Sequence, residues 1–367
     1  MSSLMPLNST PFELGLADAV DLGPRISSGI ASIPGWKVVT KPAALLPFLV
    51  YEYGLEDLRP FIPNLYELVS EGRQWARIRG THGSITQGLG WLGYFGTIEN
   101  PPTRRNAWAD FQLNLDRIRE DEDDLPRIEG IVSLSGPARS HFRRGVHGYD
   151  VPAAEGGFTR IGFSIFGDDS GARIDGGRAK WSFGRTFVLQ GSLKEPDLTE
   201  LETWIPEVIG SLWADMQFLW SEANFAWSLP AEQARRQTIG AALDHRPTLI
   251  RLDNGDGGII GYRRAIARTV SSIPAGPYVV DGVGYAPDED RPEKLLVQAR
   301  TGFGDGAGQT VSDAFVVFDA ELAPGVPDGK LWLEPSEVLA GIETVSGALT
   351  LELGETSREH IQFLLGF

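Results

Sequence analysis

The sequence contains no cysteine. This absence excludes disulfide bonds, thiolate zinc sites and cysteine nucleophiles, so stability has to come from packing or from assembly with other chains. No apolar stretch reaches the ~18 residues that span a bilayer. Residues 1–13 also lack the basic and apolar parts of a signal peptide. We therefore expect a protein that is made in the cytoplasm and does not insert into a membrane.

Basic residues are scarce relative to acidic ones, with 33 Lys and Arg against 49 Asp and Glu and a formal net charge of -16. A surface of that sign repels phosphate backbones, so nucleic acid is not an expected partner. The length of 367 residues exceeds one typical hydrophobic core, which predicts two or three domains.

Common catalytic motifs are also missing, including H-E-x-x-H, G-x-S-x-G, the Walker A loop and Ser-x-x-Lys. Gly302, Gly304 and Ala307 fit a loose dinucleotide-binding pattern, but a predicted strand follows them where that motif requires a helix. The segment 253–257 is similar to a calcium loop, yet its side-chain ligands are out of register. Both segments are therefore predicted to be turns.

His141 and His147 lie near Asp150 and could in principle bind a metal. Hydrogen bonding within loops is the simpler role for these histidines. We expect no catalytic residue, no metal site and no cofactor, and hence a protein that is not an enzyme.

Apolar residues recur at helical spacing between Lys41 and Gly93. The three runs are Ala44, Leu45, Phe48 and Leu49; Ile62, Leu65, Tyr66 and Val69; and Ile85, Leu89 and Leu92. Gly80 and Gly93 are predicted to end helices, and Thr81 to cap the third. Gly83, Gly88 and Gly90 inside the third helix indicate close packing against another helix.

The middle of the chain is less regular. The acidic run from Glu120 to Asp124 is predicted to be a solvated loop, and residues 158–189 to form short strands joined by turns. Residues 191–198 read as a linker. Thr199 and Glu202 have the form of a capping box before a long central helix, and a second helical piece is predicted over residues 231–243.

Trp213, Trp220 and Trp227 recur every seven residues, so a continuous helix would align them in one aromatic stripe. Such a stripe is typical of a core, but aromatic residues are also enriched at interfaces. After Pro247 the apolar pattern changes to a period of two, with turn signals such as Asn254-Gly255 and Asp281-Gly282. This pattern predicts an all-β domain, of a sandwich type.

The predicted fold class is therefore α+β, with a helical N-terminal region that includes short strands, a long central helix and a C-terminal all-β sandwich-like domain. The predicted regions are 1–98, 99–190, 191–246 and 247–367.

Several ordered segments resemble the phage tail protein I family. Residues 4–13, LMPLNSTPFE, are similar to the opening "LLPPNATPLE" of that family, and residues 44–49 to its "LLPWLA" element. Residues 77–93 resemble a helix boundary of the form "HRRKGT...L...LG", whereas residues 51–57 are shorter than the usual Trp-rich segment. Segments near 147–150 and 168–185 are similar to longer tail proteins.

The resemblance implies a structural baseplate wedge protein of a contractile tail. Its implied partners are two copies of a J-like wedge protein and a tail fibre or neighbouring baseplate subunit, and its place is the virion. The residues expected at interfaces are Leu45, Phe48, Leu49, Gly80, Thr81, Leu89, Leu92, Trp213, Trp220 and Trp227.

Two other functions stay open from the sequence. The β domain could recognise a receptor or glycan, which predicts a shallow groove lined by Trp or Tyr. A glycan-degrading enzyme would instead need two facing carboxylates, and 49 acidic residues allow many such pairs.

Overall fold

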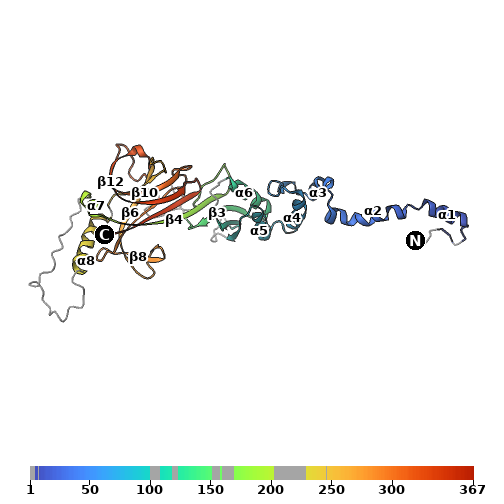
Figure 1. The fold of residues 1–367 in the computed structure, drawn as a ribbon, viewed down its shortest axis with the longest axis horizontal. Helices are drawn as coiled ribbons and strands as arrows, with labels where there is room; N and C mark the ends of the chain where they lie inside the picture. Colours follow the sequence, from blue (N-terminus) through green and yellow to red (C-terminus); the bar gives the residue numbers. More distant parts are fainter. Residues whose placement is uncertain are drawn as a thin grey trace, which may run out of the picture. The chain divides into compact units, whose positions relative to one another are not determined.

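The computed structural model describes residues 5–6, 8–99, 108–117, 123–150, 158, 169–201, 229–244 and 246–367. The chain divides into two compact units. Unit 1 comprises residues 1–93 and 130–138, and unit 2 comprises residues 94–129 and 139–367. Figure 1 shows the helices of unit 1 and the strands of unit 2 as a ribbon coloured along the sequence from blue to red.

Unit 1 begins with three helical segments, α1 (Pro11–Val20), α2 (Gly23–Gly35) and the π-helical turn η1 (Trp36–Thr40). None of the α1 residues is buried. These helices lie within the first 40 residues of the predicted helical region 1–98, where the sequence analysis named no individual helix.

The rest of unit 1 is a helical core. Its elements are η2 (Ala43–Leu45), α3 (Leu46–Glu52), η3 (Glu56–Leu58), α4 (Leu65–Ile78), α5 (His82–Trp91) and the second half of α6 (Asp124–Ser135). Leu49, Leu68, Ile85 and Ile131 are fully buried within it. Three helices are thus confirmed between residues 41 and 93, although Ile62 precedes α4 rather than belonging to it.

Glycine shapes this core in the two ways that the sequence predicted. Gly80 and Gly93 adopt positive φ values of 85° and 73° where α4 and α5 end. A Cβ atom on Gly88 would lie 2.6 Å from Ile131 Cγ1, so α5 and α6 approach more closely there than any larger residue allows. Ser135 joins the helices, because its hydroxyl accepts a hydrogen bond from Trp75 Nε1 at 3.0 Å and its carbonyl one from Ser84 Oγ at 2.8 Å.

The first strands of unit 2 form a mostly parallel sheet. They are β1 (Gly96–Glu99), β2 (Asp110–Leu115), β3 (His141–Gly148) and β4 (Lys180–Ser192). β2, β3 and β4 run parallel, and β4 then pairs in parallel with the last strand, β13 (Ser357–Gly366). The N-terminal and C-terminal parts of unit 2 therefore share one sheet.

The remaining strands extend this sheet in antiparallel fashion. They are β5 (Thr248–Asp253), β6 (Ile259–Ser272), β7 (Tyr278–Val280), β8 (Val283–Pro287), β9 (Lys294–Arg300), β10 (Thr310–Leu322), β11 (Trp332–Leu333) and β12 (Val338–Glu352), with the turn η6 (Pro335–Glu337) before β12. β6 is shared, since its first half pairs with β5 and its second half with β9. β12, at one end of the strand order, faces β4, because a Cβ atom on Gly191 of β4 would approach Val345 Cγ1 of β12 to 2.5 Å.

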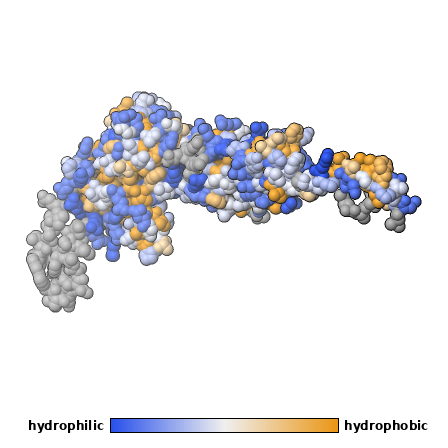
Figure 2. Space-filling model, turned by 45° about the vertical axis from the view of Figure 1, so that its right-hand side comes forward, coloured by the Kyte–Doolittle hydropathy of each residue, from blue (hydrophilic) through white to orange (hydrophobic). Residues whose placement is uncertain are grey.

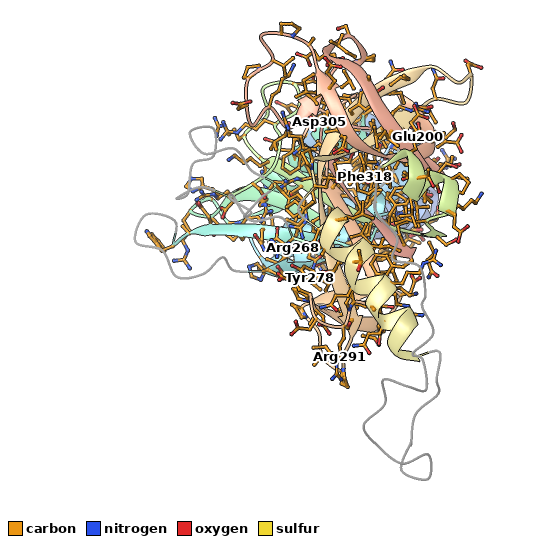
Figure 3. All side chains as sticks on the ribbon, turned by 90° about the vertical axis from the view of Figure 1, so that its left-hand side faces the viewer. Glu200, Arg268, Tyr278, Arg291, Asp305 and Phe318 are labelled. Carbon is orange, nitrogen blue, oxygen red and sulfur yellow. The ribbon has the colours of Figure 1, made fainter. Side chains whose placement is uncertain are left out.

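The main core of unit 2 lies between these facing parts. Phe318 of β10 and Phe363 of β13 are both fully buried in it, and Figure 3 shows Phe318 among the crowded side chains of the sheet. A Cβ atom on Gly347 of β12 would lie 3.1 Å from Leu189 of β4. α7 (Glu195–Glu200) and α8 (Leu229–Leu243) contribute Leu198 and Ile239 to the same core.

The C-terminal strands thus form a sheet as predicted, and the helical piece over 231–243 is confirmed by α8. A long central helix is not part of the described structure, since residues 202–228 lie outside it. Thr199 does not begin a helix, because α7 already begins at Glu195 and ends at Glu200. The predicted linker is wrong at its start, where Gly191 and Ser192 still belong to β4 and pair with β13.

Two further expectations need correction. Asp124 does not lie in a solvated loop: it is buried, begins α6 and accepts a hydrogen bond from Tyr94 at 3.1 Å. Residues 180–192 form one long strand rather than several short ones. Strands from residues 99–190 and from residues 247–367 share one sheet, since β4 pairs with β13.

Candidate docking surface and buried polar clusters

The N-terminal helices have clear start signals. Thr10 and Glu13 form a capping box, in which Thr10 N donates to Glu13 Oε2 at 2.7 Å and Glu13 N to Thr10 Oγ1 at 3.4 Å. The hydrogen bonds that Thr10 N and Thr10 Oγ1 donate to Glu13 Oε2 lower the pKa of the Glu13 carboxyl. Asp21 Oδ1 accepts a hydrogen bond from Gly23 N at 2.7 Å and so helps to start α2.

Large apolar side chains on these helices are exposed. Ten residues of these helices are exposed in this way, and together we call them the N-terminal stripe: Phe12, Leu14, Leu16, Val20, Leu22, Ile26, Ile30, Ile33, Trp36 and Val39. Their exposed fractions range from 41% for Leu14 to 80% for Val39. In Figure 2 apolar residues gather over the helices at the right-hand end of the view. A patch of this kind is typical of an interaction site.

The spacing of the stripe is helical. Leu22, Ile26, Ile30 and Ile33 are separated by four, four and three residues, so they line one face of α2. Ser27, Ser28 and Ala31 lie on the opposite face. The sequence analysis missed this stripe, although the Thr10–Glu13 capping box and the isoleucine spacing were visible. Four glycines and three prolines in residues 11–35 weaken the helical signal there.

A second exposed apolar pair continues in α3. Phe48 is 70% exposed and Tyr51 is 76% exposed, three residues further along the helix. Lys37 Nζ contacts Glu52 Oε1 at 2.6 Å, and this ion pair connects η1 to α3.

The predicted interface residues of unit 1 separate into two groups. Phe48 and Thr81 are exposed, and Leu45 and Gly80 are half-buried. Leu49, Leu89 and Leu92 are buried in the helical core and are not accessible in this chain. Trp213, Trp220 and Trp227 lie outside the described residues.

The histidines near Asp150 do not converge on a common point. His147 Nδ1 contacts the carbonyl oxygen of Leu115 at 2.7 Å, and His141 Nδ1 lies 3.6 Å from Asp110. Asp150 is paired with the buried guanidinium of Arg144. Within the described ranges, no group of three or more His, Asp and Glu residues is arranged to hold a metal.

An ion pair with a fully buried carboxylate, Arg185–Glu359, joins β4 and β13 in unit 2. Glu359 is fully buried, and both its carboxylate oxygens accept hydrogen bonds from Arg185 Nε at 3.0 Å. Burial raises the pKa of the Glu359 carboxyl, and Arg185 partly opposes this shift. Burial, with the cations Arg300 and Arg358, also lowers the pKa of the neighbouring His360 to about 3.

Both glycine-rich segments are turns, as predicted. Asn254 Oδ1 accepts hydrogen bonds from the backbone of Asp256 and Gly258 between β5 and β6. Asp305, between β9 and β10, accepts from Gly302 N and pairs with Arg263 at 2.8 Å. Their polar groups serve the fold of the loop itself.

Aromatic residues of the β strands also serve packing. Trp332 lies against Gly261, where a Cβ atom would approach its ring to 2.4 Å, and its Nε1 donates to Glu334 at 3.0 Å. Tyr262 and Tyr285 are buried.

No helix in the described part of the chain is long and apolar enough to cross a membrane. Residues 5–139 match the model of a protein family described as phage tail protein (Tail_P2_I). The matched range contains α1 to α6 in full, and it includes the whole N-terminal stripe. A search of the curated proteins finds no match. The family match supports a structural role in a phage tail and a place in the virion.

Proposed function

We propose that this chain is a structural baseplate wedge protein of a contractile phage-type tail. In this role it assembles in the host cytoplasm with two copies of a J-like wedge protein and connects to a tail fibre or a neighbouring baseplate subunit. The observation that carries the proposal is the exposed N-terminal stripe, which lies in the range matched to the tail protein family.

Free energy favours covering this stripe. Burying one aliphatic side chain completely contributes ~1.5–3 kcal/mol. Ten side chains that are roughly half exposed therefore offer on the order of 10 kcal/mol before the costs of association. An obligate partner in an assembled particle can recover that free energy.

The polar clusters are consistent with a protein that holds its shape and performs no chemistry. Glu359 and Asp150 are each neutralised by an arginine, and Asp253 by Arg251 at 2.9 Å. We accordingly propose that the chain is not an enzyme and needs no cofactor. Purified protein is expected to leave glycans, peptides and esters unchanged, and turnover abolished by one carboxylate substitution would contradict this.

A photo-crosslinking residue at Ile30 tests the docking role directly. In assembled tails it should form a covalent product with a second tail protein, identified by mass spectrometry. The matched control is the same residue at Ser28, an exposed position on the opposite face of α2. Equal crosslinking at both positions, or none at Ile30, would contradict the proposal.

A further inference from the structure

A second exposed apolar surface lies in unit 2, outside the range matched to the tail protein family. The β7–β8 hairpin is paired to the main sheet through β8 and β6, and Figure 1 shows it projecting from the lower side of the strands. Ile273, Val279 and Val283 are 42%, 61% and 45% exposed. We call these residues, together with the exposed Pro274, Ala275 and Pro277, the hairpin patch.

The loop before β7 lies against the same face of the hairpin that carries Val279. Gly284 is the register partner of Val279, so a side chain on either residue lies on one face of the hairpin. A Cβ atom on Gly284 would be 2.6 Å from both Gly276 N and Ile273 O, because the loop backbone occupies that space. Ile273 N also donates to Gly284 O at 2.9 Å. Val279 and the loop that begins at Ile273 therefore lie beside the same glycine.

The opposite face of the hairpin is anchored. Val280 and Tyr285 are buried in a small apolar cluster of the sheet. Asp281 and Gly282, with φ values of 50° and 79°, supply the two positive values that a type I′ turn requires. The inner face and the turn thus hold the hairpin in place, and the exposed face is left for contact with another molecule.

The surroundings of the patch are acidic. Residues 269–290 contain no Lys or Arg, and they contain Asp281, Asp288, Glu289 and Asp290. Glu293 Oε2 accepts hydrogen bonds from Ser272 N at 3.0 Å and from Ser272 Oγ at 2.7 Å, which holds a fifth carboxylate next to the start of the loop. The same two bonds lower the pKa of the Glu293 carboxyl, so it keeps its charge near neutral pH. A surface of this sign repels anionic lipid and a second copy of itself.

We propose that the hairpin patch docks into an apolar recess, bordered by Lys or Arg, on another protein of the tail. This inference rests on the proposed function and adds which surface of unit 2 makes the outward connection. The exposed apolar side chains supply affinity, and the carboxylates favour a basic partner. A contact of this size is weak by itself, but it becomes effective once the tail holds both proteins at high local concentration.

A photo-crosslinking residue at Val279 in assembled tails tests the contact. It should form a covalent product with a tail protein other than this chain, and mass spectrometry should place the crosslink in a segment that contains apolar residues and Lys or Arg. The matched control is the same residue at Leu339 of β12, which is 58% exposed and lies outside the patch. That position should give no product.

Val279→Thr/Val283→Thr tests the apolar part of the contact. Threonine keeps the branched shape and suits a strand, but its hydroxyl opposes burial in an apolar recess. The crosslinked protein retained per copy of this chain in purified, diluted tails should fall about 10-fold, whereas the amount of this chain should stay the same. The urea midpoint of the isolated double variant should not change. Val280→Thr, in the buried face, should lower it.

Neutralising the carboxylates tests the basic border. Asp281→Asn/Glu289→Gln/Asp290→Asn keeps the turn, because Asn-Gly also forms a type I′ turn. Retention of the crosslinked protein should fall about 5-fold at low salt and should no longer depend on salt concentration. Asp256→Asn, in the exposed turn between β5 and β6, is the control and should change nothing.

Other outcomes overturn the inference. A Val279 crosslink to a second copy of this chain would assign the patch to self-association. Binding to vesicles of phosphatidylcholine and phosphatidylglycerol that is lost in Val279→Thr/Val283→Thr would assign it to a membrane surface. No product at Val279, or equal products at Val279 and Leu339, would mean that no specific partner covers it. A Val279 crosslink without one at Ile30 would reject only the docking of the N-terminal stripe, and the reverse result would reject only the hairpin contact.

Discussion

The N-terminal helices and the sheet of unit 2 differ in which side chains they expose and which they bury. The helices expose isoleucine, leucine and tryptophan to solvent, whereas the sheet buries even charged groups such as Glu359 and Arg144. The main core of the sheet is buried within this one chain. The exposed apolar face of the N-terminal helices contributes little to the stability of the chain alone. Covering that face with a partner contributes free energy to assembly.

The difference also separates substitutions that lower the free energy of unfolding from substitutions that weaken assembly. Changes in the sheet should act on the free energy of unfolding, because they leave buried groups without partners. Changes on the N-terminal stripe should act on assembly. The predictions below test this division, beginning with the largest effect.

Removing Arg185 should damage unit 2 most. Arg185→Met leaves Glu359 fully buried without its cation, and breaking a buried pair from one side costs about 3–5 kcal/mol. The double variant Arg185→Met/Glu359→Met should recover much of this loss, since no charge stays unpaired. Urea unfolding measures both. Lys330→Ala, which breaks a more exposed pair with Glu337, is the control and should cost at most about 1 kcal/mol.

Acid should weaken the sheet through His360. Its pKa is about 3 in the folded chain and about 6.5 when unfolded, so the unfolded chain binds the extra proton between these values. Stability should therefore fall as the pH drops from 6.5 towards 3. At about 1.4 kcal/mol per unit, the loss by pH 4.5 is roughly 2 kcal/mol after discounting for partial burial.

The shift at Glu359 has the opposite sign. Its raised pKa means that the folded chain binds the proton more tightly, so this contribution is present at low pH and fades as the pH rises through the folded pKa. It offsets part of the effect of His360. His360→Gln should therefore flatten the decline in urea midpoint between pH 7 and 4.5, and an unchanged decline would show that other groups cause it.

Packing inside the helical core offers a finer comparison. A larger side chain at Gly88 of α5 would collide with Ile131, so Gly88→Val should cost about 1–3 kcal/mol. Gly90 lies in the same helix with nothing within 4 Å of a Cβ position, so Gly90→Ala should instead stabilise by about 0.5–1 kcal/mol. Thermal unfolding distinguishes the two. Loss of stability in both variants would argue against the close approach of α5 and α6.

The sequence predicted the local elements well where periodicity and glycine agree. α4, α5 and most C-terminal strands lie where apolar spacing and turns such as Asn254-Gly255 placed them. It could not reveal that β13 pairs with β4, because residues 357–366 and 183–192 are far apart in sequence and neither pattern names its partner. The prediction of a linker over residues 191–198 was wrong at its start for the same reason, since Gly191 and Ser192 pair with the distant strand β13.

The candidate site was harder to predict. Apolar periodicity marks residues that avoid water, but it does not say whether this chain or another one covers them. Leu49 and Leu89 were therefore assigned to an interface although they are core, whereas Ile26 and Ile30 were overlooked although they are exposed. The helices that carry Ile26 and Ile30 were missed because their helical signal is weakened by Gly15, Gly29 and Pro34.

The smallest expected effect is also the sharpest test of the comparison. The triple variant Ile26→Ser/Ile30→Ser/Ile33→Ser removes three side chains that are 50–62% exposed, so the free energy of unfolding of the isolated chain should change by less than about 0.5 kcal/mol for each substitution. Leu89→Ala, a buried residue of α5, should cost about 2–5 kcal/mol. Incorporation into tails, measured by quantitative mass spectrometry of purified particles, should instead fall more in the triple variant than in Leu89→Ala. The triple variant folds normally but lacks the surface that its partner covers. A triple variant that is both stable and fully incorporated would separate the stripe from assembly. One that unfolds would mean that residues 22–35 pack within this chain and that the contrast between the two regions does not hold.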